Sequence, residues 1–214
     1  MNITNIIFDL DGTLIDSAPS ILATLAEALS IHKLQPKISL EAGVVGPPLR
    51  ETFTQLTGRD DTALLDSLIN TFMSQYDAVG YKSTTIFPGV PELLTGLAQR
   101  HIPIYIATNK RLNPTLLILE HLGWTSHFKG VYALDCVEPR HLNKANMLAH
   151  ALRDIGDGPQ HIAYVGDKHD DGLAADASSL PFFKASWGYG VGDTREIGQG
   201  WRTLQRPEDL LATL

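Results

Sequence analysis

Five short apolar runs recur along the chain, and each is too short to form a core helix. Most are rich in β-branched or aromatic residues, which favours strands. They lie at residues 6–10, 102–108, 130–135, 161–167 and 180–185. Segments with helical periodicity separate the later runs, at residues 90–100, 112–122, 143–155 and 171–178. Strands that alternate with helices predict βαβ units and an α/β fold with a doubly wound parallel sheet.

The stretch between the first two runs breaks this alternation. It contains no clear buried strand and consists of three helical patterns, "APSILATLAEALSI", "LRETFTQLTG" and "TALLDSLINTFMSQYDAV". Pro88-Gly89 then marks a turn that returns the chain to the sheet. We therefore expect an α/β core formed by residues 1–16 and 83–214, with an α-helical cap domain inserted at residues 17–82.

Polar residues stand where three of the predicted strands end. Asp9 and Asp11 follow the first apolar run, Thr108-Asn109 closes the second, and Asp167 closes the fourth. Open parallel sheets bind ligands outside the carboxyl ends of their strands. If these three strands are neighbours, three acids, one hydroxyl group and a nearby lysine, Lys110, converge on one crevice.

Two aspartates this close together repel one another unless a cation lies between them. The oxygen ligands are clustered without cysteine or ligand-spaced histidine, which favours a hard cation, most plausibly Mg²⁺. An aspartate beside Mg²⁺ can attack phosphorus and form an aspartyl phosphate. The second aspartate can then serve as general acid for the leaving oxygen and as base for water.

Composition narrows the class of protein. The chain has 214 residues, of which 43% are apolar and 19% are charged, as in ordinary globular proteins. Its net charge of -7 argues against a nucleic-acid partner. It has no long apolar span and no positively charged leader, so we expect a cytoplasmic protein with no membrane partner. The single cysteine, Cys136, excludes an intramolecular disulfide and a multi-cysteine zinc site, and we expect it to be a small buried thiol.

Three motifs occur in order, each at a predicted strand end: "DLDGT" at 9–13, "ATN" at 107–109 and "GDKHDD" at 166–171. Together they resemble the motifs of the haloacid dehalogenase-like superfamily, in its phosphatase branch with a helical cap. The resemblance covers the whole chain, and within the superfamily the chain is similar to phosphoglycolate phosphatases. It implies a Mg²⁺-dependent phosphomonoester hydrolase acting on a small phosphorylated metabolite. For its oligomeric state we expect a monomer or a weak homodimer.

The resemblance also implies roles for individual residues. Asp9 would be the nucleophile and Asp11 the general acid/base. Mg²⁺ would be held by Asp9, the main-chain carbonyl of Asp11, and Asp167, with Asp171 in a metal-shell or orienting role. Thr108 would bind the transferring phosphoryl group. Three further residues are expected beside the substrate: Gly12, Thr13 and Asn109.

The lysine motif departs from the common form, in which a proline soon follows the lysine. The segment "CVEPRHLNKANML" offers both Arg140 and Lys144. We favour Lys144, because it opens the next helix, a placement that the resemblance to some phosphoglycolate phosphatase-like relatives implies, and its ammonium can reach back to the site from there. In the cap, Arg50 follows the rigid Gly46-Pro47-Pro48 turn. In similar capped phosphatases this region faces the active site, so the resemblance makes Arg50 a candidate ligand for a substrate carboxylate or second phosphate. An ion pair with a neighbouring acid is the alternative for Arg50.

Several alternatives stay open at this point. Thr108-Asn109 also suits a helix cap, and His169 fits an exposed loop better than a metal site. The segment "WGYGVGD" at 187–193 is either an active-site loop or a plain surface loop. A sugar-phosphate mutase shares the first motif but typically lacks a threonine at the place of Thr13. A non-enzymatic phospho-receiver domain uses similar groups, but it is shorter and lacks both the second aspartate and the helical insert.

Overall fold

The central strand of the sheet is β1 (Asn5–Phe8), and all four of its residues are buried. The computed structural model describes residues 2–190, 195 and 198–214. Its main sheet has six parallel strands in the order β5-β4-β1-β6-β7-β8. The other strands are β4 (Ile104–Thr108), β5 (Phe128–Ala133), β6 (Ile162–Gly166), β7 (Phe182–Ala185) and β8 (Arg202–Leu204). The predicted parallel sheet is confirmed, and the strands β4, β1 and β6 that carry the polar ends are adjacent.

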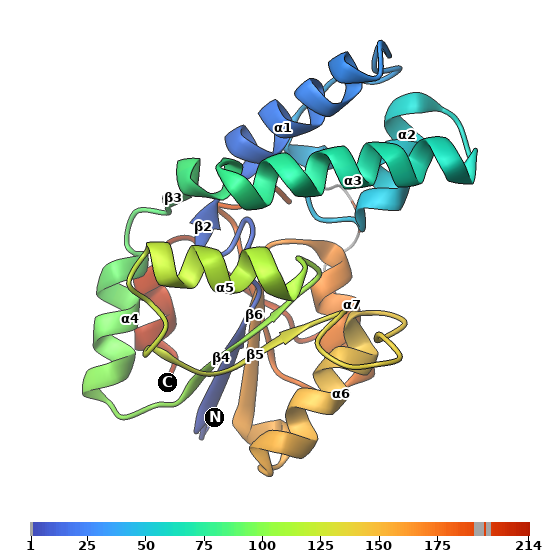
Figure 1. Ribbon diagram of the computed structural model, residues 1–214. Coiled ribbons are helices and arrows are strands. Elements are labelled where there is room, and N and C mark those ends of the chain that lie inside the picture. The colour runs from blue at the N-terminus through green and yellow to red at the C-terminus, as the bar shows by residue number, and fades with distance from the viewer. Residues whose placement is uncertain (1, 191–194, 196–197) are drawn as a thin grey trace.

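Helices cover both faces of this sheet (Figure 1). Ile6 and Phe8 point into one apolar core and Ile7 into the other, because side chains alternate along a strand. The helices on the first face are α4 (Val90–Gln99), α5 (Leu112–His121) and the 3₁₀ helix η4 (Pro207–Ala212). Those on the second are α6 (Lys144–Ile155) and α7 (His169–Ala177), and η3 (Pro159–His161) leads into β6. Burial on both faces explains why the strands are continuous apolar runs.

Three further helices form a layer beyond one end of the sheet, which we call the cap (Figure 1). They are α1 (Ala18–Ile31), α2 (Leu49–Thr57) and α3 (Thr62–Ala78), with the 3₁₀ helices η1 (Ala42–Val44) and η2 (Gly80–Ser83). The cap has its own apolar core, in which Phe53 and Phe72 meet edge to face at 6.4 Å. Two short strands, β2 (Ile15–Asp16) and β3 (Thr85–Ile86), pair antiparallel where the chain enters and leaves the cap. No helix among the described residues is long and apolar enough to cross a membrane.

Candidate active site

Three buried carboxylates meet where β1 and β6 end. Asp9, Asp167 and Asp171 are each no more than 7% exposed, and one ligand oxygen from each lies within 4.8 Å of the others. Burial raises the pKa of Asp9 to about 6, against the opposing attraction of Lys144. Burial and the charges of Asp171 and Asp9 raise the pKa of Asp167 to about 7. The positive charge near these three carboxylates is therefore too small to balance their negative charge.

The ammonium of Lys144 lies among these acids. Its Nζ donates to Asp171 Oδ1 at 2.5 Å and lies 3.2 Å from Asp9 Oδ1. Burial alone would lower the pKa of Lys144, but the carboxylates of Asp171 and Asp9 outweigh it and hold that pKa well above its usual value. Lys144 begins α6, and the side chain of Asn143 caps that helix. Arg140 is exposed and lines a cavity under the cap, so the structure brings Lys144 and not Arg140 to the acids.

The donor set at this cluster fits Mg²⁺. Asp9 Oδ1 is buried and accepts no hydrogen bond from the described residues. Asp171 is already engaged: Oδ1 accepts from Tyr164 Oη at 3.3 Å as well as from Lys144, and Oδ2 accepts from the Lys168 N–H at 3.0 Å. All of the acidic donors are oxygens, which a small hard dication prefers. Asp9, Asp167 and Asp171 each offer an oxygen to such an ion, and Asp171 also holds the Lys144 ammonium.

Gly12 and Thr13, which were expected beside the substrate, both lie against Asp167. Gly12 has φ +86°, and a Cβ there would stand 2.5 Å from Asp167 Oδ2. The Thr13 hydroxyl is fully buried and donates to Asp167 Oδ1 at 3.5 Å. The N–H groups of Tyr189 and Gly190 donate to Asp167 Oδ2 at 2.7 and 3.2 Å. The loop at 187–190 therefore belongs to the site, while residues 191–193 of the same motif lie outside the described residues.

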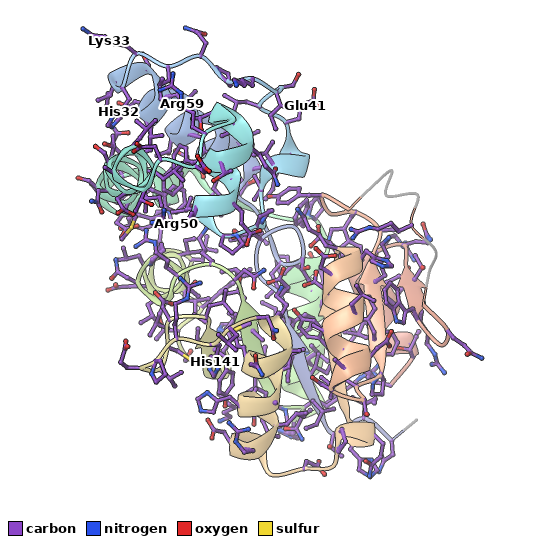
Figure 2. The ribbon with its side chains drawn as sticks, turned by 90° about the vertical axis from the view of Figure 1, so that its right-hand side faces the viewer. His32, Lys33, Glu41, Arg50, Arg59 and His141 are labelled. Carbon is purple, nitrogen blue, oxygen red and sulfur yellow. The ribbon has the colours of Figure 1, made fainter. Side chains whose placement is uncertain are left out.

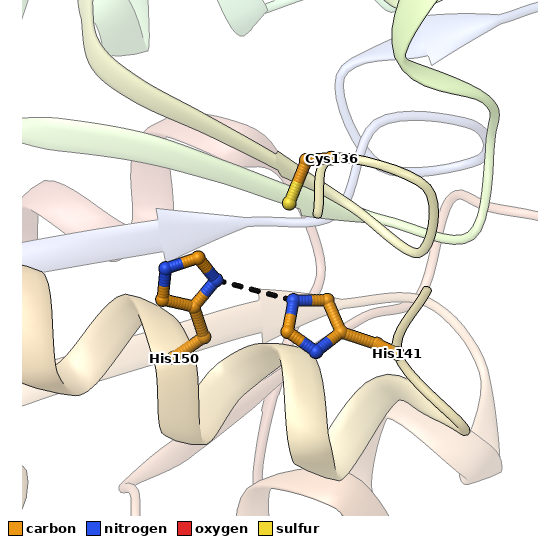
Figure 3. Close-up of side chains that lie close together, drawn as sticks. All are labelled: Cys136, His141 and His150. Carbon is orange, nitrogen blue, oxygen red and sulfur yellow. Dashed lines mark hydrogen bonds between the residues drawn. The ribbon is translucent and has the colours of Figure 1, made fainter. Parts of the chain in front are cut away.

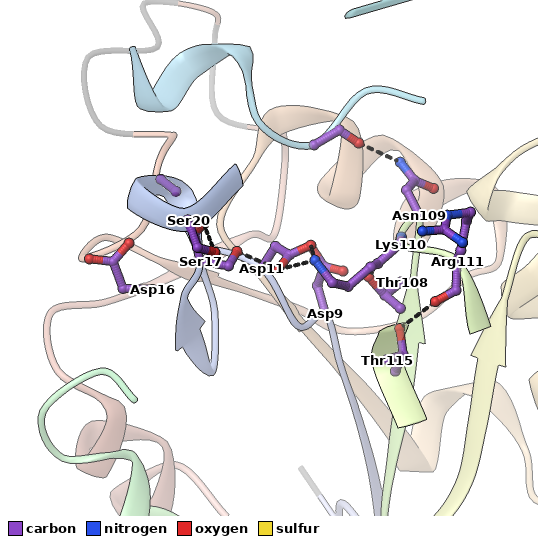
Figure 4. Close-up of polar contacts among 12 residues, drawn as sticks. Asp9, Asp11, Asp16, Ser17, Ser20, Thr108, Asn109, Lys110, Arg111 and Thr115 are labelled. Carbon is purple, nitrogen blue, oxygen red and sulfur yellow. Dashed lines mark hydrogen bonds and ion pairs between the residues drawn. The ribbon is translucent and has the colours of Figure 1, made fainter. Parts of the chain in front are cut away.

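Asp11 has a different environment from the three buried acids (Figure 4). Ser17 Oγ donates to its Oδ1, and both of its carboxylate oxygens accept from Lys110 Nζ at 3.2 Å. The Lys110 ammonium also lies 4.6 Å from the ring centroid of Tyr76 on α3. Thr108 is 1% exposed, and its hydroxyl accepts from the Lys110 N–H at 3.2 Å. Lys110 follows Thr108-Asn109 at the end of β4 and reaches the crevice as the strand-end pattern predicted, but its pairing with Asp11 was not predicted.

The residues on either side of Lys110 also contact the cap. Asn109 Nδ2 donates to the Gly46 carbonyl at 3.4 Å, and the guanidinium of Arg111 pairs with both carboxylate oxygens of Asp77 at 2.9 and 2.6 Å. Figure 4 shows Asn109, Lys110 and Arg111 fanning out from the end of β4. One segment of the core therefore meets the general-acid candidate and the cap at the same time.

A cavity of about 370 Å³ adjoins Asp11 and Lys110 beneath the cap. Its cap wall is largely apolar and includes Val45, Leu49, Ile69, Phe72 and Met73. Arg50 lies on this wall but is paired with Asp66 on α3, and the two side chains are 48% and 52% exposed. Figure 2 shows Arg50 on the side of the cap toward the core. The structure thus places Arg50 beside the cavity, with a carboxylate of the cap itself as its partner.

Two expectations about single residues were wrong. His169 is the first residue of α7 rather than a loop residue, and its ring lies 5.1 Å from that of Trp201. The side chain of Trp201 covers it, so the residue is half-buried. Cys136 is half-buried rather than buried, because it lies in the loop after β5 and not in the strand.

The raised pKa values of Asp9 and Asp167 predict how the metal-free protein responds to pH. Both groups hold protons in the folded state that the unfolded chain has already released, so stability falls as pH rises from about 4 to about 7. Thermal unfolding in EDTA should therefore show a lower midpoint at pH 8 than at pH 5, by several degrees. Mg²⁺ should restore part of the loss at pH 8, and Asp167→Asn should flatten the pH dependence. A midpoint that rises across this range would contradict the charge distribution described here.

Comparison with known proteins identifies the family. A family model described as haloacid dehalogenase-like hydrolase matches residues 6–185. A phosphoglycolate phosphatase of Xanthomonas campestris is 36% identical over 190 residues, covering 88% of this chain and 85% of that protein. The tyrosine-protein kinase PtkA of Mycobacterium tuberculosis is 33% identical over 189 residues, covering 88% of this chain, which spans only 64% of the kinase.

A solved structure agrees at the level of the fold. A haloacid dehalogenase-like family hydrolase from Streptococcus pneumoniae superimposes with a TM-score of 0.83 at 24% identity, covering 99% of this chain and 98% of that one. Sequence and fold thus point to the same group of proteins, over a span that contains all of the acids described above. The chain belongs to the haloacid dehalogenase-like hydrolases.

Proposed function

We propose that this protein is a Mg²⁺-dependent phosphomonoester hydrolase that acts on a small phosphorylated metabolite through an aspartyl-phosphate intermediate. The observation that carries this proposal is the buried Asp9 Oδ1, which accepts no hydrogen bond among the described residues and lies 3.2 Å from the Lys144 ammonium. An oxygen that accepts no hydrogen bond keeps a lone pair available for attack on phosphorus. Phosphate-releasing relatives, a phosphoglycolate phosphatase and a 5'-nucleotidase, support the assignment.

In the first half of the reaction, an oxygen of Asp9 attacks phosphorus, and the bond from phosphorus to the leaving oxygen breaks. Asp11 donates its proton to that oxygen, so the alcohol leaves neutral. In the second half, Asp11 takes a proton from water as the water oxygen attacks the phosphorus of the aspartyl phosphate. The bond between Asp9 and phosphorus breaks, which regenerates the Asp9 carboxylate and releases inorganic phosphate. The contacts of Asp11 with Ser17 and Lys110 hold its carboxyl group in position for both transfers.

The other groups stabilise the negative charge on the phosphoryl oxygens. Lys144 supplies a fixed ammonium beside Asp9, oriented by Asp171, and the Thr108 hydroxyl stands at the end of the neighbouring strand. When bound by Asp9, Asp167 and the Asp11 carbonyl, Mg²⁺ would supply further positive charge for the phosphoryl group. Because these donors are fixed before the substrate arrives, they need little reorganisation during the reaction.

The names of the relatives and the size of the cavity suggest which leaving groups to test. We take phosphoglycolate as the first substrate to test, because several relatives are named phosphoglycolate phosphatase. The cavity of about 370 Å³ is larger than a glycolate unit needs, and its cap wall is mostly apolar. A panel of phosphate esters should therefore include larger leaving groups such as nucleosides and phosphotyrosine. Transfer from ATP to tyrosine in place of phosphate release would favour a kinase, and isomerisation of a sugar phosphate would favour a mutase.

The proposed nucleophile gives the first prediction. Asp9→Asn should lower the turnover of p-nitrophenyl phosphate to background, because an amide oxygen does not form the acyl phosphate. Circular dichroism and thermal unfolding should show that the variant remains folded. EDTA should abolish wild-type turnover, and Mg²⁺ should restore it more fully than Zn²⁺ does. Substantial turnover by Asp9→Asn, or full activity without metal, would place the reaction elsewhere.

The second prediction compares two basic residues of one segment. Lys144→Met should lower kcat/KM. The fall should correspond to about 2–4 kcal/mol of lost transition-state stabilisation, as for the loss of one charge-stabilising donor. Arg140→Met removes another cation of the same segment, one that does not touch the acids, so its effect should be far smaller. Steady-state kinetics in saturating Mg²⁺ measures both. A larger loss in Arg140→Met would mean that Arg140 is the residue that contacts the phosphoryl group.

The third prediction concerns Arg50 and its partner. If Arg50 turns to a substrate carboxylate, Arg50→Ala should raise KM for phosphoglycolate about tenfold, a loss of about 1.4 kcal/mol. Asp66→Asn frees the same guanidinium and should lower that KM. Neither change should affect p-nitrophenyl phosphate, which has no carboxylate.

Arg59→Ala provides the control, because Arg59 is another exposed arginine of the cap (Figure 2). It should leave both substrates unchanged. Equal losses on both substrates in Arg50→Ala would assign Arg50 to the stability of the cap, through its pair with Asp66.

A further inference from the structure

A second group of metal-ligating side chains lies outside the carboxylate cluster (Figure 3). It consists of Cys136, His141 and His150, whose ligand atoms all lie within 4.8 Å of one another. His141 Nε2 and His150 Nδ1 face each other at 3.1 Å. Cys136 and His141 come from the loop between β5 and α6, and His150 comes from the second turn of α6. The sequence spacing gave no sign of this group, because the loop folds back to bring the three together.

We propose that Cys136, His141 and His150 form a zinc site that is separate from the carboxylate site. A thiolate and two imidazoles are ligands that Zn²⁺ prefers and Mg²⁺ does not. This group should therefore select Zn²⁺, whereas the carboxylate site should select Mg²⁺. Two nitrogens on a tetrahedral zinc, each about 2.0–2.1 Å from the metal, stand about 3.3 Å apart. The observed 3.1 Å between the imidazole nitrogens is close to that separation.

The surroundings of His150 support the assignment. The other ring nitrogen, His150 Nε2, lies 3.4 Å from Asp154 Oδ2 one turn along α6. Zinc-binding histidines commonly donate their second N–H to a carboxylate, which fixes the tautomer and orients the ring. The ring of Tyr132 packs edge to face against His150 at 5.5 Å and limits its rotation. His150 is therefore held with Nδ1 aimed at His141 and Cys136.

Access and coordination number also agree with a bound ion. All three side chains are half-buried, so a metal can enter from solvent without unfolding the chain. Three protein ligands leave the fourth tetrahedral position for water. The ion would tie the loop after β5 to α6, the helix that begins with Lys144. Its main effect would therefore be on the stability of this segment, independently of the proposed phosphatase reaction.

Cobalt(II) provides a selective probe, because Cys136 is the only cysteine in the chain. Titration of the full-length protein with Co²⁺ in excess Mg²⁺ should produce a thiolate-to-cobalt charge-transfer band, which Zn²⁺ then removes. Cys136→Ser should abolish the band, and His141→Gln and His150→Gln should each weaken Co²⁺ binding at least tenfold. Asp154→Asn should weaken it by about 10–100-fold, the range for loss of such a carboxylate.

Two matched variants separate this site from other causes. His127→Gln changes an exposed histidine outside the group and should bind Co²⁺ like the wild type. Asp167→Asn disables the carboxylate site and should keep the band. Zn²⁺ should raise the unfolding temperature of the wild type but not of Cys136→Ser, because it stabilises only the state that binds it. Absence of the band, or unchanged affinity in both histidine variants, would overturn the proposal.

Discussion

Gathering three carboxylates in a pocket where their side chains are buried is unfavourable unless positive charge compensates for them. In this protein, Asp9, Asp167 and Asp171 share such a pocket, and one ammonium, that of Lys144, lies among them. The sheet and two helix starts bring these four residues together. The adjacent parallel strands β1 and β6 bring Asp9 and Asp167 to one edge, and the starts of α6 and α7 supply Lys144 and Asp171. The same deficit of positive charge that costs stability without metal favours the binding of a cation, which we propose to be Mg²⁺.

Asp11 lies outside the cluster of three buried carboxylates and is connected to the cap through Lys110. Lys110 pairs with Asp11 and packs on Tyr76, while its neighbours Asn109 and Arg111 contact the cap. The group that we propose to transfer protons is therefore held by the same segment that meets the cap. Opening of the cap would weaken the contact between Lys110 and Tyr76 and loosen the surroundings of Asp11. Closure would then complete the site as well as exclude water.

The sequence alone predicted the parallel sheet and the helical stretch after its first strand, because apolar periodicity depends on local rules. Lys144 was favoured on the resemblance to capped phosphatases, and its role stays a prediction. The sequence did not predict the β2–β3 ribbon, whose two-residue strands are too short to show a pattern. Lys110 was expected near the crevice, but its contacts with Asp11 and Tyr76 were not predicted because these partners are distant in sequence. The grouping of Cys136 with His141 and His150 depends on the path of one loop, which no spacing rule describes.

A crystal structure of the protein with Mg²⁺ and fluoroberyllate tests the central claim most directly, because fluoroberyllate mimics a phosphoryl group on a carboxylate. The account predicts beryllium bonded to an oxygen of Asp9, with Mg²⁺ in contact with Asp9 and Asp167 and with Lys144 facing the fluorides. Beryllium on Asp11, or Mg²⁺ bound away from Asp9 and Asp167, would contradict it.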